Sequence, residues 1–378
     1  MIIGVNTRFL LKHKMEGFGW FTFETISRIV QRYPEHQFIF FFDRAFDTKF
    51  VFADNVTPVV VYPPARHPIL FKIWFDYALP KQLKKYKCEA FISPDGFVSL
   101  KTKLPQLAVI HDLNFEHNPM DIPSSARKYL CNYFPKFAQK AKRICTVSNY
   151  SKQDIINTYG VSASKIDVTY NGASPLFQPI PETEKFITQK KYTQERPYVL
   201  FVGAIHKRKN LQRLIDAFER LKKETDLPHC LLIVGEPLFS KKNIIIPKTL
   251  DEHLFFTGHI SLENLAKITA SADLLAFVSY FEGFGIPMVE AMQSGTCVLA
   301  GNKTSLPEIG ANAAHYCDPF DINSIYHEMT YLLKHPSVRE KYVQKGLLRA
   351  NEFSWEQTAD KLWDSFRKMM KVENEIND

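Results

Sequence analysis

The stretch SYFEGFGIPMVEAMQSGTCVLAGNKTSLPEIG, residues 279–310, decides the fold of this chain. An apolar run at residues 274–278 precedes it and predicts a buried strand. A loop with Gly283 and Gly285 follows, and Pro287 stands where a first helical residue is expected, a position that suits proline because its N–H would have no partner there. A glycine loop that leads into a helix presents backbone N–H groups beside the positive end of a helix dipole, which suits a diphosphate.

Two glutamates flank this glycine loop. Glu282 lies in the loop, and we expect Glu290 in the first turn of the helix, pointing into the same pocket. A carboxylate there could accept hydrogen bonds from two ribose hydroxyls. The simpler interpretation is that Glu290 only complements the helix dipole and that Glu282 is a solvated loop residue.

The same alternation of short apolar runs with amphipathic stretches continues through the whole chain. It predicts an α/β protein with parallel sheets, and 378 residues favour two domains rather than one. Candidate strands lie at residues 2–6, 38–42, 90–92, 107–110, 144–147, 198–202, 230–234, 254–256, 274–278 and 297–300.

The domain boundary is expected in the segment NGASPLFQPIP, residues 171–181, which holds one glycine and three prolines. We therefore predict a first domain at residues 1–175 and a second at 190–352. The stretch that follows, residues 353–372, begins FSWEQTADKLWDSF and predicts a terminal amphipathic helix.

Charge is distributed unevenly between the two halves. Residues 1–180 hold 23 Lys and Arg against 14 Asp and Glu, a net charge of +9, whereas the remainder holds 25 against 26. A basic amino-terminal half indicates an anionic partner such as a membrane surface. The segment 65–87, with its Phe, Trp and Tyr residues and six basic residues, could lie on an anionic membrane. Alternatively, its aromatic side chains face the core of their own domain.

Several classes of protein are excluded or disfavoured. The six cysteines are scattered without a C-x-x-C pair, which argues against a zinc site and a disulfide framework and favours the cytoplasm. No apolar run approaches the roughly 20 residues of a spanning helix, and the basic-then-apolar pattern of a signal peptide is not seen at the start. No D-x-D triplet is present, so we expect no metal. The first strand is not followed by G-x-G-x-x-G, which argues against a nicotinamide dehydrogenase. Net charge is the single feature that favours nucleic-acid binding, and it is a weak indication.

The run 279–310, with seven residues between its two glutamates, resembles the signature of family-four retaining glycosyltransferases of GT-B fold. The resemblance implies two Rossmann-like domains whose parallel sheets face each other across a cleft. It also implies that Glu282 contacts the donor sugar and Glu290 the ribose. The family's glycine loop meets the sugar and phosphates, a role that falls on Gly283, Phe284 and Gly285.

Further motifs in the second half carry the same resemblance. VLFVGAIHKRKNLQRLIDAF, residues 199–218, resembles the opening of the family's second domain and implies that Arg208 and Lys209 bind the diphosphate near Gly203. FFTGHISLENLAKITASADLLAFVS resembles its base-binding region and implicates Gly258 and His259.

Motifs of the first half complete the resemblance. LAVIHDLNF places His111 where the family has a histidine at the anomeric centre of the donor. Gly17 and Gly19 resemble a glycine loop that closes over the phosphates. Trp20 and Ala204 depart from the family, because many members carry arginine at these two positions.

The resemblance implies a metal-independent retaining glycosyltransferase with no cofactor. Its donor would be a nucleotide-diphosphate sugar, GDP-mannose or a UDP-sugar, and its acceptor a glycan or a lipid-linked hydroxyl. Alternatives are an epimerase or phosphorylase of related fold, or a sugar-nucleotide-binding protein that has lost catalysis. The epimerase would turn over donor without acceptor.

Overall fold

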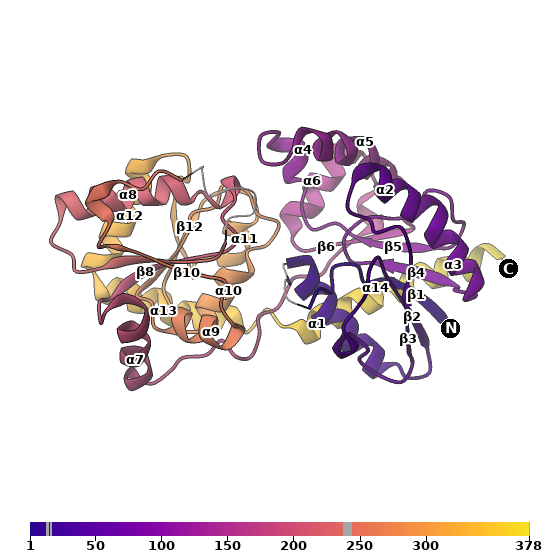
Figure 1. The fold of residues 1–378 in the computed structure, drawn as a ribbon, viewed down its shortest axis with the longest axis horizontal. Coiled ribbons are helices and arrows are strands. Elements are labelled where there is room, and N and C mark those ends of the chain that lie inside the picture. Colours follow the sequence, from indigo (N-terminus) through magenta and orange to yellow (C-terminus); the bar gives the residue numbers. More distant parts are fainter. Residues whose placement is uncertain (13–14, 16, 237–243, 378) are drawn as a thin grey trace. The chain divides into compact units, whose positions relative to one another are not determined.

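The computed structural model describes residues 1–12, 15, 17–236 and 244–377, with side chains up to residue 371. The chain forms two compact units (Figure 1). Unit 1 contains Met1–Asn171 and the carboxy-terminal residues from Trp355, and unit 2 is Gly172–Ser354. The division therefore falls within the Pro-containing segment, and residues 172–175, which we expected in the first domain, belong to unit 2.

Unit 1 is built on a seven-stranded parallel sheet with the order β3-β2-β1-β4-β5-β6-β7. Its strands are β1 (Ile2–Asn6), β2 (Gln37–Phe42), β3 (Val56–Val60), β4 (Ala90–Ser93), β5 (Gln106–Val109), β6 (Arg143–Thr146) and β7 (Ile166–Val168). The inner strands are buried on both faces, which explains their uninterrupted apolar sequences.

Helices cover both faces of this sheet (Figure 1). They are α1 (Gly17–Arg32), α2 (Pro68–Ile73), α3 (Leu79–Lys85), α4 (Asn114–His117), α5 (Ser124–Lys140), α6 (Asn149–Tyr159) and α14 (Trp355–Asn377). A π-helical turn, η2 (Trp74–Ala78), joins α2 to α3. Short 3-10 turns lie at η1 (Thr48–Phe50) and η3 (Ala163–Lys165).

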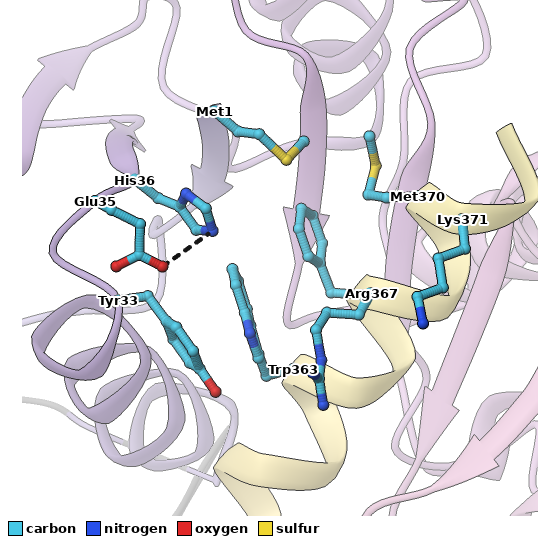
Figure 2. Close-up of a pocket in the computed structure, with 9 residues that line it drawn as sticks. Met1, Tyr33, Glu35, His36, Trp363, Arg367, Met370 and Lys371 are labelled. Carbon is cyan, nitrogen blue, oxygen red and sulfur yellow. Dashed lines mark ion pairs between the residues drawn. The ribbon is translucent and has the colours of Figure 1, made fainter. Parts of the chain in front are cut away.

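The terminal helix α14 packs against α1 in unit 1. Its Trp363 stacks on Tyr33, with ring centroids 4.4 Å apart (Figure 2). The ring of Phe366 stacks on Trp363 at 4.8 Å. A cavity of about 380 Å³ remains beside these rings. It is bordered by Met1 and His36, which directly precede β1 and β2, so it lies at the amino ends of the strands. Ligands of such sheets bind at the opposite, carboxyl edge.

Unit 2 contains a six-stranded parallel sheet with the order β10-β9-β8-β11-β12-β13. Its strands are β8 (Tyr198–Val202), β9 (Cys230–Val234), β10 (Leu254–Gly258), β11 (Leu274–Phe277), β12 (Val298–Gly301) and β13 (His315–Cys317). Its helices are α7 (Glu182–Thr193), α8 (Leu211–Glu224), α9 (Leu262–Ala270), α10 (Ile286–Gln293), α11 (Leu306–Gly310), α12 (Ile322–Lys334) and α13 (Pro336–Ala350). Helices α8 and α12 pack together on one face, and α9, α10 and α13 cover the other (Figure 1). The 3-10 turns η4 (Lys207–Lys209) and η6 (Lys248–Leu250) lie in its loops.

All ten predicted strands are present, with ends shifted by up to two residues. Three strands of the described residues were not predicted, namely β3, β7 and β13. β3 carries Pro58, which is tolerated there because β3 is an edge strand. β7 and β13 have only three residues each, too few for a visible apolar run.

Candidate active site

The order of strands reverses in unit 2 between β8 and β11. These two strands are neighbours in the sheet, although β9 and β10 lie between them in the sequence and continue the sheet on the other side of β8. Ligands of open α/β sheets bind beyond the carboxyl ends of the strands at such a switch point. The loop after β8 contains η4, and the loop after β11 leads into α10. The two motifs singled out in the sequence therefore meet at this point.

The carboxylate of Glu282 joins the two loops. One oxygen, Oε2, accepts a hydrogen bond from Arg208 Nη1 at 2.5 Å, and the other, Oε1, lies 2.7 Å from Lys209 Nζ. Arg208 Nη1 also donates to the carbonyl oxygen of Phe281 at 3.0 Å. The Glu282 side chain is 7% exposed and that of Lys209 is 11% exposed. Glu282 is thus a buried, doubly paired residue and not a solvated one.

The ionisation of Glu282 follows from these contacts. Burial by itself would raise the pKa of the carboxyl, but the charges of Arg208 and Lys209, together with their hydrogen bonds, lower the pKa to about 2. The group is ionised throughout the neutral range. Two cationic side chains converge on one carboxylate here, and cationic side chains are the groups that bind anionic ligands most strongly.

The loop after β8 is shaped by a glycine and held by the side-chain amide of Asn210. Gly203 has φ +135°, and a Cβ built there would lie 3.4 Å from Lys209 Cε, so the lysine side chain runs close over this residue. Asn210 has φ 63° and donates through Nδ2 to the carbonyl oxygens of Val278 and Pro319, at 3.0 and 2.6 Å. The amide of Asn210 thereby links the loop to the ends of β11 and β13.

A glycine caps the amino end of helix α10. Gly285 adopts φ +105° at the N-cap, a conformation that glycine adopts without strain. The helix starts at Ile286, so Pro287 is its second residue and not its first. Gly283 and Phe284 are buried, and the ring of Phe284 packs edge-on against Phe353 at 5.5 Å. Only the backbone of Phe284 is therefore suited to contact a ligand.

Glu290 lies one residue further into its helix than expected. It is the fifth residue of α10, and the first turn contains no acidic residue, so our first-turn prediction was wrong. The prediction failed because the helix begins at Ile286, one residue before the expected first position at Pro287. The side chain is partly exposed, and burial raises the pKa of this carboxyl to about 8.

Glycines end three neighbouring strands of the unit 2 sheet. The N–H of Gly203 donates to the carbonyl of Val234, and that of Gly235 donates to the carbonyl of Gly258, at 3.0 and 3.1 Å. A Cβ on Gly235 would lie 2.0 Å from the carbonyl oxygen of Gly203. Gly258 therefore lies at the same edge as Gly203, and His259 follows it as an exposed residue.

Sequence reasoning missed several residues that shape this site. Gly235 is one, and its position directly after an apolar strand was the available signal. Thr304 and Ser305 are others: Thr304 Oγ1 accepts from the N–H of Glu282 at 3.1 Å, and Ser305 Oγ donates to its carbonyl oxygen at 2.9 Å. Both fall inside the stretch 279–310, but nothing in their spacing indicated these bonds.

In unit 1, His111 lies just beyond the carboxyl end of β5. Its Nε2 is 2.8 Å from the carbonyl oxygen of Pro94, and its ring meets Phe18 and Phe21 edge-on at 4.8 and 4.9 Å. Burial lowers the pKa of the imidazole, so the neutral ring donates its Nε2 hydrogen to Pro94 and keeps Nδ1 as an acceptor.

The Pro94 carbonyl is positioned by a buried ion pair beside it. Arg8 Nε donates to Asp95 Oδ2 at 2.6 Å, and both side chains are 3% exposed. Asp95 Oδ1 accepts from the N–H of Phe97 at 3.1 Å. These bonds fix the turn that follows β4 and, through it, the orientation of His111.

Gly17 and Gly19 do not form a loop. Both lie in the first turn of α1, so the predicted glycine loop is wrong for these two residues. Gly17 has open space where a side chain would be, whereas a Cβ on Gly19 would lie 2.7 Å from the carbonyl oxygen of Phe9. Gly19 is explained by this close packing of α1 against the chain after β1.

The described part of the chain contains no cluster of three or more His, Cys, Asp or Glu side chains arranged to hold a metal ion. Within the same residues, none of the helices combines the length and the apolar character needed to cross a bilayer.

Two family models match the chain in succession. Residues 17–175 match Glycosyltransferase Family 4, and residues 182–349 match Glycosyl transferases group 1. The relatives include the O-antigen chain mannosyltransferase B of Escherichia coli, 28% identical over 72% of this chain and 73% of its own length. Another is the MMP alpha-(1->4)-mannosyltransferase of Mycolicibacterium hassiacum, 27% identical over 68% of this chain and 64% of the relative.

Solved structures share the fold along nearly the whole chain. Sucrose-phosphate synthase from Thermosynechococcus elongatus superposes with a TM-score of 0.77 at 17% identity, covering 98% of this chain and 99% of its own. Anabaena HepE in complex with UDP-glucose gives 0.76 at 16% identity, with 97% and 100% covered. Together, the family matches, the two parallel sheets and these structures place the chain in the group 1, family 4 glycosyltransferases of GT-B fold.

Proposed function

We propose that the protein transfers a mannosyl group from a nucleoside-diphosphate donor to a hydroxyl of a glycan or lipid-linked acceptor, with retention of configuration, in polysaccharide or glycolipid synthesis. The observation that carries this proposal is the cluster of Arg208, Lys209 and Glu282 at the switch point of unit 2. Its two cationic side chains and the neighbouring start of α10 suit a diphosphate.

The choice of mannose rests on the relatives. Those described above are mannosyltransferases by name, and so is the O-antigen chain mannosyltransferase RfbU of Salmonella typhimurium, 29% identical over 58% of this chain. GDP-mannose is accordingly our first donor. HepE is described in complex with UDP-glucose, so a UDP-sugar is the second.

The chemistry requires negative charge to be stabilised as the diphosphate leaves. The bond between the anomeric carbon and the diphosphate oxygen breaks, and a bond from the anomeric carbon to the acceptor oxygen forms. The acceptor proton passes to the departing oxygen on the same face of the sugar, which retains the configuration. Preorganised cations and N–H groups are the protein groups that most lower such a barrier.

Each residue of the cluster has a role in this scheme. Arg208 and Lys209 turn from Glu282 towards the diphosphate, and the N–H groups of Gly283 and Gly285 add donors. Glu282 then accepts hydrogen bonds from hydroxyls of the donor sugar. Glu290 holds the ribose, Gly258 and His259 border the base, and His111 of unit 1 orients the sugar through its Nδ1 acceptor.

The setting of the reaction is also part of the proposal. We place the protein in the cytoplasm, in keeping with its six free thiols, five of them buried. Two basic side chains and a helix start can neutralise a leaving diphosphate, so transfer is expected without a divalent cation. Retained activity in excess chelator checks this point, and its loss would contradict it.

The donor is identified first. Thermal unfolding is followed with GDP, UDP, ADP and their mannose and glucose derivatives, and the bound nucleotide raises the midpoint. Transfer is then measured with the selected donor and a mannose-terminated oligosaccharide. Release of nucleotide with formation of an α-linked product supports the proposal. Conversion of the donor sugar without acceptor would instead show an epimerase, and binding without either reaction a binding protein.

Substitution of the cluster tests its role. We expect Glu282→Ala and Lys209→Ala each to reduce transfer by about 10²–10³-fold, since each removes a preorganised contact. Lys207→Ala is the matched control, because Lys207 lies in the same 3-10 turn but is exposed. Near-normal turnover of Glu282→Ala or Lys209→Ala, or equal loss in Lys207→Ala, would contradict the assignment. Circular dichroism confirms that each variant is folded.

A further inference from the structure

The helical stretch at residues 68–85 of unit 1 presents an apolar and basic stripe to solvent. Ile69, Ile73 and Tyr77 are 66%, 39% and 52% exposed. They recur every four residues, and Lys81 and Lys84 continue the row along α3, both exposed. This spacing keeps the side chains on one side of a helix. We call these five residues the outer stripe.

The opposite side of the same stretch is part of the core. Trp74 and Phe75 are 0% and 1% exposed, and Leu79 and Leu83 are buried with them. The indole N–H of Trp74 donates to the carbonyl oxygen of Val61 at 2.9 Å. Trp74 and Phe75 thus face their own domain, and the exposed apolar groups of the outer stripe are not needed to fill that core.

Exposed acidic groups are absent from this region. Between residues 62 and 87, all of which the structure describes, the single acid is Asp76, which is 6% exposed. Its Oδ1 accepts a hydrogen bond from the N–H of Leu100 at 2.9 Å. The exposed basic residues of the same segment are Arg66, Lys72, Lys81, Lys84, Lys85 and Lys87. The exposed charged side chains of the segment are therefore all positive.

Helix α5 extends the cationic surface. It lies beside α2 (Figure 1), with Phe71 and Tyr129 rings 5.5 Å apart. The ammonium groups of Lys72 and Lys136 lie 5.9 and 5.1 Å from the ring of Tyr133 between them. The seventeen residues of α5 contain four basic side chains and no acid. Residues 65–87 and α5 together hold ten of the 23 basic residues of the amino-terminal half.

We infer that this face docks the protein on an anionic lipid bilayer, with the outer stripe in the headgroup region. Exposed isoleucines at the centre of a cationic surface gain free energy by entering the boundary of a bilayer, and the lysines gain by meeting anionic headgroups. A water-soluble polyanion would satisfy the lysines but would leave Ile69 and Ile73 in water. The inference goes beyond the proposed reaction and concerns the surface on which it takes place.

Flotation of the full chain with lipid vesicles tests this directly. Vesicles of phosphatidylcholine alone are compared with vesicles of equal parts phosphatidylcholine and phosphatidylglycerol. We expect binding to the second kind only, weakening as salt rises because screening shortens the reach of the charges. The assay involves no sugar transfer, so a failure of this inference leaves the proposed function untouched. A failure of the proposed function would likewise leave this inference untouched.

Variants separate the two contributions. Lys81→Gln with Lys84→Gln should weaken partitioning roughly 25-fold, since each lysine near an anionic surface contributes roughly fivefold. Ile69→Ser with Ile73→Ser should weaken it at least about tenfold through lost apolar burial. The matched control is Lys341→Gln with Leu348→Ser on α13 of unit 2, where Leu348 is 73% exposed.

Three results would overturn the inference. One is no binding to either kind of vesicle, including the case in which the protein binds heparin instead. Another is equal binding of the wild type to neutral and anionic vesicles. The third is binding by both outer-stripe variants that is as strong as that of the wild type. A loss of binding in the α13 control as large as that in the outer-stripe variants would count equally against it. Thermal unfolding midpoints within the experimental error of the wild type show that a loss of binding is not a loss of fold.

Discussion

At the scale of single residues, the two acids of unit 2 differ in their protonation. Glu282 is paired with two cations and its pKa lies near 2, whereas burial raises the pKa of Glu290 to about 8. At neutral pH the first is a carboxylate, and the second is mostly protonated in the free protein. Ligand hydroxyls that donate hydrogen bonds to Glu290 would favour its ionised form.

This difference predicts a pH-dependent affinity for nucleotide. If ribose hydroxyls donate to Glu290, binding lowers its pKa below about 8, and a proton is released near pH 7. The complex then holds fewer protons than the free protein, so affinity rises with pH, by at most about tenfold per unit, and levels off above pH 8. Calorimetry in buffers of different ionisation enthalpy measures the released proton.

Glu290→Gln should abolish both the proton release and the slope, and Glu263→Gln, an exposed carboxyl on α9, should change neither. A wild-type protein that releases no proton would refute this role of Glu290.

The sequence alone could indicate which residues matter in unit 2 but not how they pair. Arg208, Lys209 and Glu282 were each expected near the diphosphate or the sugar. Their mutual ion pairs join residues more than seventy positions apart, through the order of β8 and β11 in the sheet. Such contacts follow from strand order, which apolar periodicity does not contain.

At the scale of elements, the close approach of two strand ends supports the site. Gly235 has φ +143°, and a Cβ there would lie 2.0 Å from the carbonyl oxygen of Gly203. The loop that carries Arg208 and Lys209 begins at this contact. The end of β9 therefore packs directly against the start of this loop.

Gly235→Ala should consequently destabilise unit 2 by more than the roughly 1–3 kcal/mol that a strained backbone costs. The added carbon also pushes apart the strand ends at Gly203 and Gly235. Gly258→Ala is the control: its φ of +67° is strained, but no atom lies within 4 Å of the new Cβ. Urea unfolding gives both free energies. The explanation fails if Gly235→Ala is no more destabilised than Gly258→Ala.

Elements were predicted best where burial leaves a long apolar run. β8 and β9 match their predicted ends because both faces are buried and five apolar residues follow one another. The start of α10 was misplaced because a glycine in the left-handed region caps it, and nothing in FGIP shows which residue first becomes helical. The prediction of a loop at the first turn of α1 was wrong because two glycines so close together are more typical of a loop than of a helix.

At the scale of the whole molecule, the two units differ in charge and in chemistry. The amino-terminal half carries the excess of basic residues, and unit 2 carries the cluster at the switch point. The sequence predicted both units, because the alternation of strands and helices occurs twice. It left open which way the aromatic side chains of residues 65–87 face, and the structure places Trp74 and Phe75 in the core.

Calorimetric titration with the diphosphate and the monophosphate of the preferred nucleoside tests the central claim most directly. We predict that the wild type and Lys207→Ala bind the diphosphate about 10–100-fold more tightly than the monophosphate, as expected for charge-assisted hydrogen bonds to the second phosphate. Lys209→Ala should lose most of this preference. Equal affinity for the two nucleotides in the wild type, or an unchanged preference in Lys209→Ala, would show that the cluster of Arg208, Lys209 and Glu282 does not hold a diphosphate.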